Sequence, residues 1–125
     1  MVQLNFKGDK PIYEQIIEQI KMNVMKQYLK PGDDIPSVRK LALELKITPG
    51  TVAKAYQELE RQGVIETIRG KGTFIASEIN IKPDEDKLKS ARENMRTQII
   101  ELKMMGYEKK KIVELVNELY EEMSV

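Results

Sequence analysis

The sequence predicts a mainly α-helical protein with a small β-hairpin and a pair of helices at its C-terminal end. Three observations support this prediction. In two short segments, separated by a turn of about three residues, apolar residues recur at spacings of three and four, as in amphipathic helices. The spacing then becomes two on either side of a glycine-rich tetrapeptide, which is typical of a hairpin. Two further stretches with helical spacing follow.

The first expected helix begins at Asp9-Lys10-Pro11 and runs to about Leu29, after a short extended segment at residues 2–7. Proline in the first helical turn loses no helical hydrogen bond, and Lys30-Pro31-Gly32 ends the helix. We expect its apolar stripe to pack into the core and to carry no chemistry. The stripe consists of Ile12, Ile16, Ile17, Ile20, Val24 and Tyr28.

Two short helices follow. Ser37 can cap the first, which stops near Lys46. Thr48 offers a hydroxyl cap to the second, Pro49 takes its first position and Gly63 closes it. Their apolar residues are Val38, Leu41, Ala42 and Leu45 in the first helix, and Val52, Ala55, Tyr56 and Leu59 in the second. So short a turn indicates a helix-turn-helix, which presents its second helix to the DNA major groove.

Residues 64–75 alternate as a two-stranded hairpin does, with a basic and glycine-rich tip at Arg69-Gly70-Lys71-Gly72. A helix-turn-helix followed by such a hairpin is a winged helix. We therefore assign residues 1–77 to a winged helix-turn-helix DNA-binding domain.

We expect residues 78–125 to form a two-helix dimerisation hairpin. Pro83 and the acidic run Asp84-Glu85-Asp86 favour a helix start, and Gly106-Tyr107 separates the two helices. Two such helices cannot cover all of their apolar surface, so we expect a two-fold symmetric dimer. The alternative is that the hairpin folds back onto its own winged helix. The expected dimer-interface residues are Leu88, Met95, Ile99, Leu102, Ile112, Leu115, Val116 and Leu119.

The composition argues against an enzyme. The 125 residues include no histidine or cysteine, and the compact acidic pair Asp33-Asp34 is expected in a turn. We therefore expect no catalytic site, no metal site and no cofactor. No apolar run approaches the roughly 18 residues of a membrane helix, and the N-terminus lacks a signal-peptide core, so we expect a cytoplasmic protein without membrane contact. Net charge is only +1, yet residues 37–72 hold seven basic and four acidic side chains.

The residues expected to contact DNA come from the start of the first motif helix, the N-terminal half of the second, and the hairpin tip. Hydroxyl and cationic groups at the first place can meet phosphates, and a narrow basic tip can enter the minor groove. The expected contact residues are Ser37, Arg39, Lys40, Thr48, Gly50, Thr51, Lys54, Arg69, Gly70, Lys71 and Gly72. Two alternatives stay open: Arg39 as a surface ion-pair partner, and Tyr56 as a phosphate contact instead of a core residue.

The motifs GDxxPSxRxLAxxL, AYxxLExxG and GxGTF, with a TV pair between the first two, resemble those of GntR-type bacterial transcription regulators. The run TPGTVAKAYQELE looks most like the YtrA-like subfamily, and the resemblance covers roughly residues 9–123. It implies a repressor that dimerises through its tail and binds an inverted-repeat DNA operator. Many such regulators have arginines where Pro49 and Ala53 stand here, so operator preference does not carry over. The alternative is a winged helix that binds protein or RNA.

Overall fold

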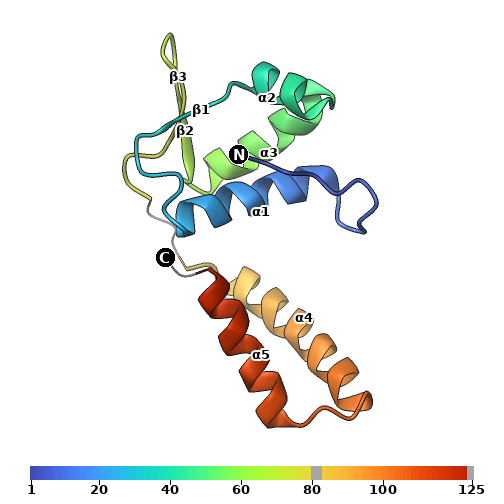
Figure 1. Ribbon diagram of the computed structural model, residues 1–125. Helices are drawn as coiled ribbons and strands as arrows, with labels where there is room; N and C mark the ends of the chain where they lie inside the picture. Colours follow the sequence, from blue (N-terminus) through green and yellow to red (C-terminus); the bar gives the residue numbers. More distant parts are fainter. Residues whose placement is uncertain (80–82, 124–125) are drawn as a thin grey trace. The chain divides into compact units, whose positions relative to one another are not determined.

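A computed structural model of the chain describes residues 1–79 and 83–123 and divides into two compact units. The first, the winged-helix unit, contains α1 (Ile12–Met25), β1 (Asp34–Ile35), α2 (Val38–Leu45), α3 (Pro49–Arg61), β2 (Ile65–Ile68) and β3 (Gly72–Ile75) (Figure 1). The second, the tail unit, contains α4 (Glu85–Met104) and α5 (Lys109–Glu122). The predicted fold class is confirmed. The predicted connection at residues 77–83 includes residues 80–82, which lie outside the described residues.

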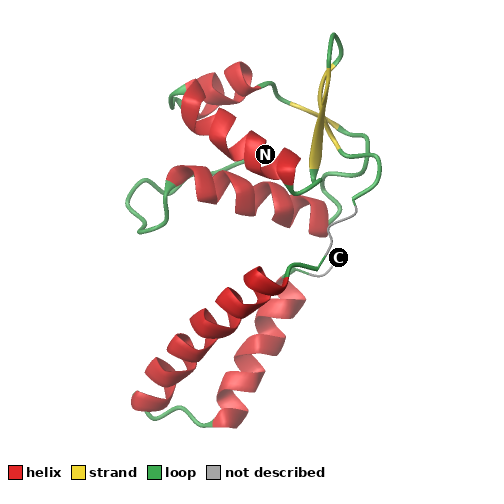
Figure 2. Ribbon diagram, turned by 180° about the vertical axis from the view of Figure 1, so that it is seen from behind, coloured by secondary structure: helices red, strands yellow, loops and turns green. Residues whose placement is uncertain are grey.

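The core of the winged-helix unit joins its three helices to its strands. Figure 2 shows α1, α2 and α3 on one side of the strands. The largest fully buried side chains come from all of these parts: Ile16, Ile20, Leu41, Val52, Leu59, Val64 and Ile75. The isoleucine stripe of α1 is therefore a core face, as predicted.

The end of α1 was predicted too late. The helix ends at Met25, and Gln27 takes a left-handed conformation with φ of 61°. Tyr28 and Leu29 both donate their backbone N–H to the carbonyl of Asn23, so the chain turns away from the helix axis. Tyr28, predicted on the buried stripe, is 73% exposed.

The sheet has three strands in the order β1-β3-β2, whereas two were predicted. β1 pairs antiparallel with β3, with Asp34 opposite Phe74 and Ile35 opposite Thr73. Asp34 thus lies in a strand and not in the predicted turn. The predicted hairpin itself is β2 and β3, with Ile65 opposite Ile75.

The two motif helices begin differently. The Ser37 hydroxyl accepts a hydrogen bond from the Lys40 backbone N–H at 3.1 Å and caps α2 as predicted. Thr48 precedes α3, but its side chain makes no capping hydrogen bond to the backbone, so that prediction was wrong. Its hydroxyl instead lies 3.1 Å from the hydroxyl of Thr51.

The N-terminal segment is held along α1 by side-chain amides. The Gln15 amide accepts from the Asn5 backbone N–H at 2.8 Å and donates to the Asn5 carbonyl at 2.9 Å. Gln19 makes the same two bonds to Gln3, and Asn23 donates to the Met1 carbonyl. Because the amides recur every four residues on a helix, they bond alternate residues of the segment.

The tail unit is a helical hairpin. The Asp84 carboxylate caps α4 by accepting from the backbone N–H groups of Asp86 and Lys87, at 3.0 and 3.2 Å. Gly106, with φ of 93°, allows the turn into α5. No described residue of α4 or α5 is buried. Among the described residues no helix is long and apolar enough to cross a membrane.

Candidate nucleic-acid interface

The first part of the candidate site is the N-terminal turn of α2. The side chains of Ser37, Arg39 and Lys40 are all exposed there. Arg39 makes no ion pair with any described residue, so the ion-pair alternative gains no support. The exposed cations and the N–H groups of this helix start can contact phosphate oxygens.

Tyr56 of α3 holds the chain just before this turn. Its side chain is buried, and its hydroxyl donates a 2.7 Å hydrogen bond to the Pro36 carbonyl, one residue before the Ser37 cap. Burial, together with the negative charge of Glu44, raises the pKa of the Tyr56 hydroxyl well above its usual range. Tyr56 is therefore a core residue as expected, and the alternative of a phosphate contact was wrong because its hydroxyl bonds the Pro36 carbonyl.

The second part is the N-terminal half of α3. Thr48, Gly50 and Lys54 are exposed and Thr51 is half-buried. A Cβ atom added at Gly50 would meet no atom within 4 Å, so the fold itself does not require glycine there. Because glycine has no side chain, nothing projects from the helix at Gly50, and the helix backbone can come close to a DNA groove there.

Sequence reasoning missed a contact of Lys54. The Lys54 ammonium lies 3.8 Å from the centroid of the Tyr13 ring, which belongs to α1. This distance is typical of a cation–π interaction. The two residues are separated by 41 positions, so no local spacing could have revealed the pair.

The third part is the tip of the β2–β3 hairpin. Arg69, Gly70, Lys71 and Gly72 are exposed, and both glycines have positive φ, 81° and 122°. The Lys71 backbone N–H closes the turn by donating to the Ile68 carbonyl at 2.9 Å. The two cations of the tip therefore extend from a narrow turn, as a minor-groove contact requires.

A groove of mixed polar and apolar lining connects the start of α2 to the tip end of the hairpin. Its polar lining consists of the α2 cap Ser37, Lys40 from α2, Gly72 and Thr73 from β3, and Asp34 from β1. The Asp34 carboxylate was not predicted at this site, and its negative charge opposes phosphate binding within the groove. In Figure 1 the hairpin tip and α2 lie on the side of the unit away from α1.

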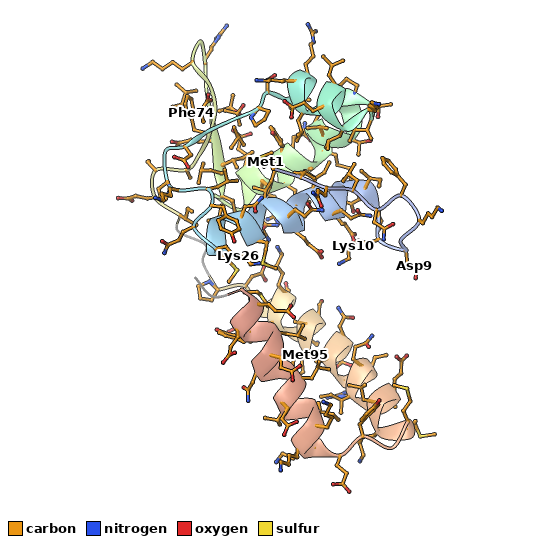
Figure 3. All side chains as sticks on the ribbon, in the orientation of Figure 1. Met1, Asp9, Lys10, Lys26, Phe74 and Met95 are labelled. Carbon is orange, nitrogen blue, oxygen red and sulfur yellow. The ribbon has the colours of Figure 1, made fainter. Side chains whose placement is uncertain are left out.

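Figure 3 shows the side chains on this ribbon, with Phe74 on the hairpin and Lys10 at the N-terminal end of α1. Lys10 forms an ion pair with Glu18 at 2.7 Å. Within the described residues no three acidic side chains are grouped as a metal ion would need. The chemistry available is that of cations, hydroxyls and exposed backbone, which suits a polyanion.

Comparison with known proteins agrees with this geometry. The family of bacterial regulatory proteins called gntR matches residues 12–75. The HTH-type transcriptional repressor YtrA of Bacillus subtilis (strain 168) is 43% identical over 119 residues, which cover 95% of this chain and 92% of the relative. The uncharacterized HTH-type transcriptional regulator YhcF of the same organism is 42% identical over 109 residues, covering 87% of this chain and 89% of the relative.

Solved structures show the same likeness. A transcriptional antiterminator from Listeria monocytogenes EGD-e has a TM-score of 0.87 at 40% identity, covering 100% of this chain and 96% of that one. YtrA from Sulfolobus acidocaldarius, a GntR-family transcription factor, has a TM-score of 0.58 at 33% identity, covering 97% of each chain. AraR(DBD) in complex with operator ORX1 has a TM-score of 0.54 at 28% identity, covering 60% of this chain and 96% of that one.

Proposed function

This chain belongs to the GntR family of bacterial regulatory proteins, and from that premise we propose that it represses transcription by binding an inverted-repeat DNA operator as a homodimer. Family membership makes it a DNA-binding transcriptional regulator and not an enzyme. The observation that best supports the proposal is that α2, α3 and the hairpin tip of one compact unit all carry exposed cations. Because the proposed partner is DNA, we propose that the protein works in the cytoplasm.

We assign different tasks to the three parts of this surface. Arg39, Lys40, Arg69 and Lys71 bind phosphates and supply affinity that does not depend on sequence. The N-terminal half of α3 and the residue before it, with Thr48, Gly50, Thr51 and Lys54, face the base edges in the major groove and supply sequence preference. The glycines of the hairpin tip let its backbone approach the minor groove.

The tail unit supports the dimer. Its described helices bury no side chain, and the eight predicted interface residues, Leu88, Met95, Ile99, Leu102, Ile112, Leu115, Val116 and Leu119, are all exposed or only half-buried. A face of this kind is covered when a second copy packs against it, and two-fold symmetry is the commonest arrangement of two copies. Two winged-helix units then bind two half-sites of an inverted repeat.

The direction of regulation comes from the relatives. The Bacillus subtilis protein that is 43% identical over nearly the whole chain is named a transcriptional repressor, and AraR(DBD) is seen bound to an operator. Repression is therefore the direction that we propose.

The test is selection of bound sequences from random double-stranded DNA by the purified full chain, followed by mobility-shift assays. We expect an inverted repeat whose half-site centres lie about one helical turn apart, roughly 10 base pairs, or a multiple of that. Light scattering at micromolar concentration is expected to give the mass of a dimer. A monomer that recovers no palindrome would contradict the proposal.

The same selection with random RNA distinguishes the alternative of a winged helix that binds RNA or protein. Tight binding without sequence preference on DNA, together with an enriched RNA motif, would favour that alternative. Enrichment on double-stranded DNA alone would support the operator.

A further inference from the structure

Lys54 is the one basic residue in the first eight positions of α3, Pro49–Tyr56. This half of the helix is the part that we assign to the major groove. A lysine ammonium sits at the end of a flexible four-carbon chain. Without a neighbouring group to hold it, the ammonium samples many positions and specifies bases poorly. In this structure the Lys54 ammonium has such a neighbour, because it lies 3.8 Å from the centroid of the Tyr13 ring.

Tyr13 is held by its helix. It lies in the first turn of α1, two and three residues before the buried Gln15 and Ile16. The Gln15 amide bonds the carbonyls of Asn5 and Lys10, at 2.9 and 2.8 Å, which fixes the chain that enters α1. Figures 1 and 2 both show the N-terminal ends of α1 and α3 at the same end of the unit. The Tyr13 side chain is half-buried against the core, and its hydroxyl donates to the Glu14 carboxylate at 3.3 Å, so the ring offers a supported surface beside the N-terminal half of α3.

We propose that Tyr13 is a positioning residue for DNA recognition, whose ring holds the Lys54 ammonium in place on the N-terminal half of α3. The inference rests on the proposed function. The negative face of the ring attracts the cation, so the ammonium occupies one region of space before DNA arrives. Operator binding then orders fewer side-chain rotamers of Lys54, which favours the complex. The first turn of α1 becomes part of the recognition surface, although the apolar stripe of α1 predicted only a core role for this helix.

A double-mutant cycle tests this coupling. The dissociation constant for the selected operator is measured by fluorescence anisotropy for the wild type, Tyr13→Leu, Lys54→Met and the double variant. Tyr13→Leu is expected to weaken binding about two- to fivefold, the range expected for an exposed cation–π pair. In the Lys54→Met background the same change is expected to leave binding unaltered within about 1.5-fold. Tyr13→Phe keeps the ring and is expected to bind as the wild type does.

Tyr28→Leu is the matched control, since Tyr28 is an exposed tyrosine that follows the other end of α1. It is expected to leave operator binding unchanged. Thermal unfolding of every variant reports whether the winged helix is intact. If Tyr13→Leu weakens binding equally with and without Lys54, the ring only supports the fold and the inference is overturned.

A second measurement does not depend on how the variants fold. A ring current shifts nearby protons upfield, so the ε-methylene proton resonance of Lys54 in the wild type is expected upfield of the other lysines, both free and bound to operator. Lys54→Met assigns that resonance by its disappearance. An unshifted resonance in the complex would overturn the inference. Failure of the proposed function looks different, since the wild type would then select no operator at all.

Discussion

The winged-helix unit buries large side chains from all three of its helices, whereas the described helices of the tail unit bury none. Leu59 of α3 is 0% exposed and Leu88 of α4 is 70% exposed, although both are leucines of amphipathic helices. A helix that leaves an apolar face in water gains little free energy from that face. One copy of the chain is therefore enough to form the core of the first unit, whereas we propose that a second copy covers the apolar face of the tail unit.

The two units also differ in how far apart in the sequence their side-chain hydrogen bonds reach. In the winged-helix unit, side chains connect segments far apart in the chain, as Tyr56 does with Pro36 and Gln15 does with Asn5. Along α4 the side-chain hydrogen bonds between described residues join residues no more than four positions apart, such as Arg96 with Glu93. Local bonds stabilise a helix but do not select its partner. Variants in the two units should consequently affect different properties.

The largest effect is expected in the core of the winged-helix unit. Leu59→Ala leaves a cavity beneath α3 and should lower the free energy of unfolding by about 2 to 5 kcal/mol. Leu43→Ala is the matched control, because Leu43 of α2 is 74% exposed, and it should change that free energy by less than about 0.5 kcal/mol. Urea unfolding followed by circular dichroism measures both. Equal losses of unfolding free energy in the two variants would contradict the prediction that the buried Leu59 stabilises the fold more than the exposed Leu43.

The tail unit is expected to respond in its association and not in its fold. Ile99→Asp places a carboxylate on the predicted interface, and dimer formation would then bury that charge. The dissociation constant of the dimer should rise about hundredfold or more. Light scattering across a dilution series measures it, while the thermal unfolding of the winged-helix unit should stay the same.

Met104→Asp is the control for this variant. Met104 is an exposed apolar residue of the same helix, 84% accessible, and it is not among the predicted interface residues. It should leave the dimer intact. If both variants dissociate the dimer equally, the assigned face is wrong.

Predictions from sequence succeeded where the signal was local. The period of the apolar residues and the Ser37 cap identified α2 and α3, and the two glycines identified the hairpin tip. β1 was missed because two residues are too few to display an alternating pattern. The end of α1 was misplaced because Gln27 adopts positive φ without being glycine. β1 forms only by pairing with the distant β3, and the end of α1 depends on a left-handed residue that is not glycine, so the local apolar pattern shows neither.

In the candidate site, too, local motifs predicted some features, whereas others depend on contacts between distant segments. Its exposed members on α2 and at the hairpin tip lie where their motifs predicted exposure. The stacking of Lys54 on Tyr13 and the place of Asp34 in the groove depend on segments that meet only in the fold. Periodicity identifies which face of a helix is polar, but it does not identify which side chain from another element lies against that face.

Within the winged-helix unit, the exposed cations should affect DNA binding alone. Arg39→Ala and Lys71→Ala should each weaken binding on all sequences and reduce the magnitude of the negative slope of log K against log salt by about one unit per lost phosphate contact. Titrations at several salt concentrations measure the slope. Lys103→Met, which removes a charge from the tail unit, is the control and should leave the slope unchanged. Unaltered affinity in both alanine variants would discredit the assigned surface.

The smallest effect is expected at Tyr56. Tyr56→Phe removes the hydroxyl that donates to the Pro36 carbonyl, so we expect a loss of about 0.5 to 1.5 kcal/mol of stability near neutral pH. The variant should also weaken operator binding slightly, because the segment that leads to the Ser37 cap loses the hydrogen bond that holds the Pro36 carbonyl. Urea unfolding and anisotropy measure the two effects.

The pH dependence of the stability difference between wild type and Tyr56→Phe distinguishes a buried hydroxyl from an exposed one. Burial raises the pKa of Tyr56 in the folded protein, while in the unfolded chain the group ionises near its usual pKa of about 10. The contribution of the neutral hydroxyl is therefore complete below about pH 10 and decreases as pH rises above that value, by at most about 1.4 kcal/mol per pH unit. The stability difference between wild type and Tyr56→Phe should be constant from pH 7 to 9 and should shrink above about pH 10. A difference that stayed constant above that pH would mean that the folded and unfolded chains ionise this group alike, and the hydroxyl could not then be held by the core.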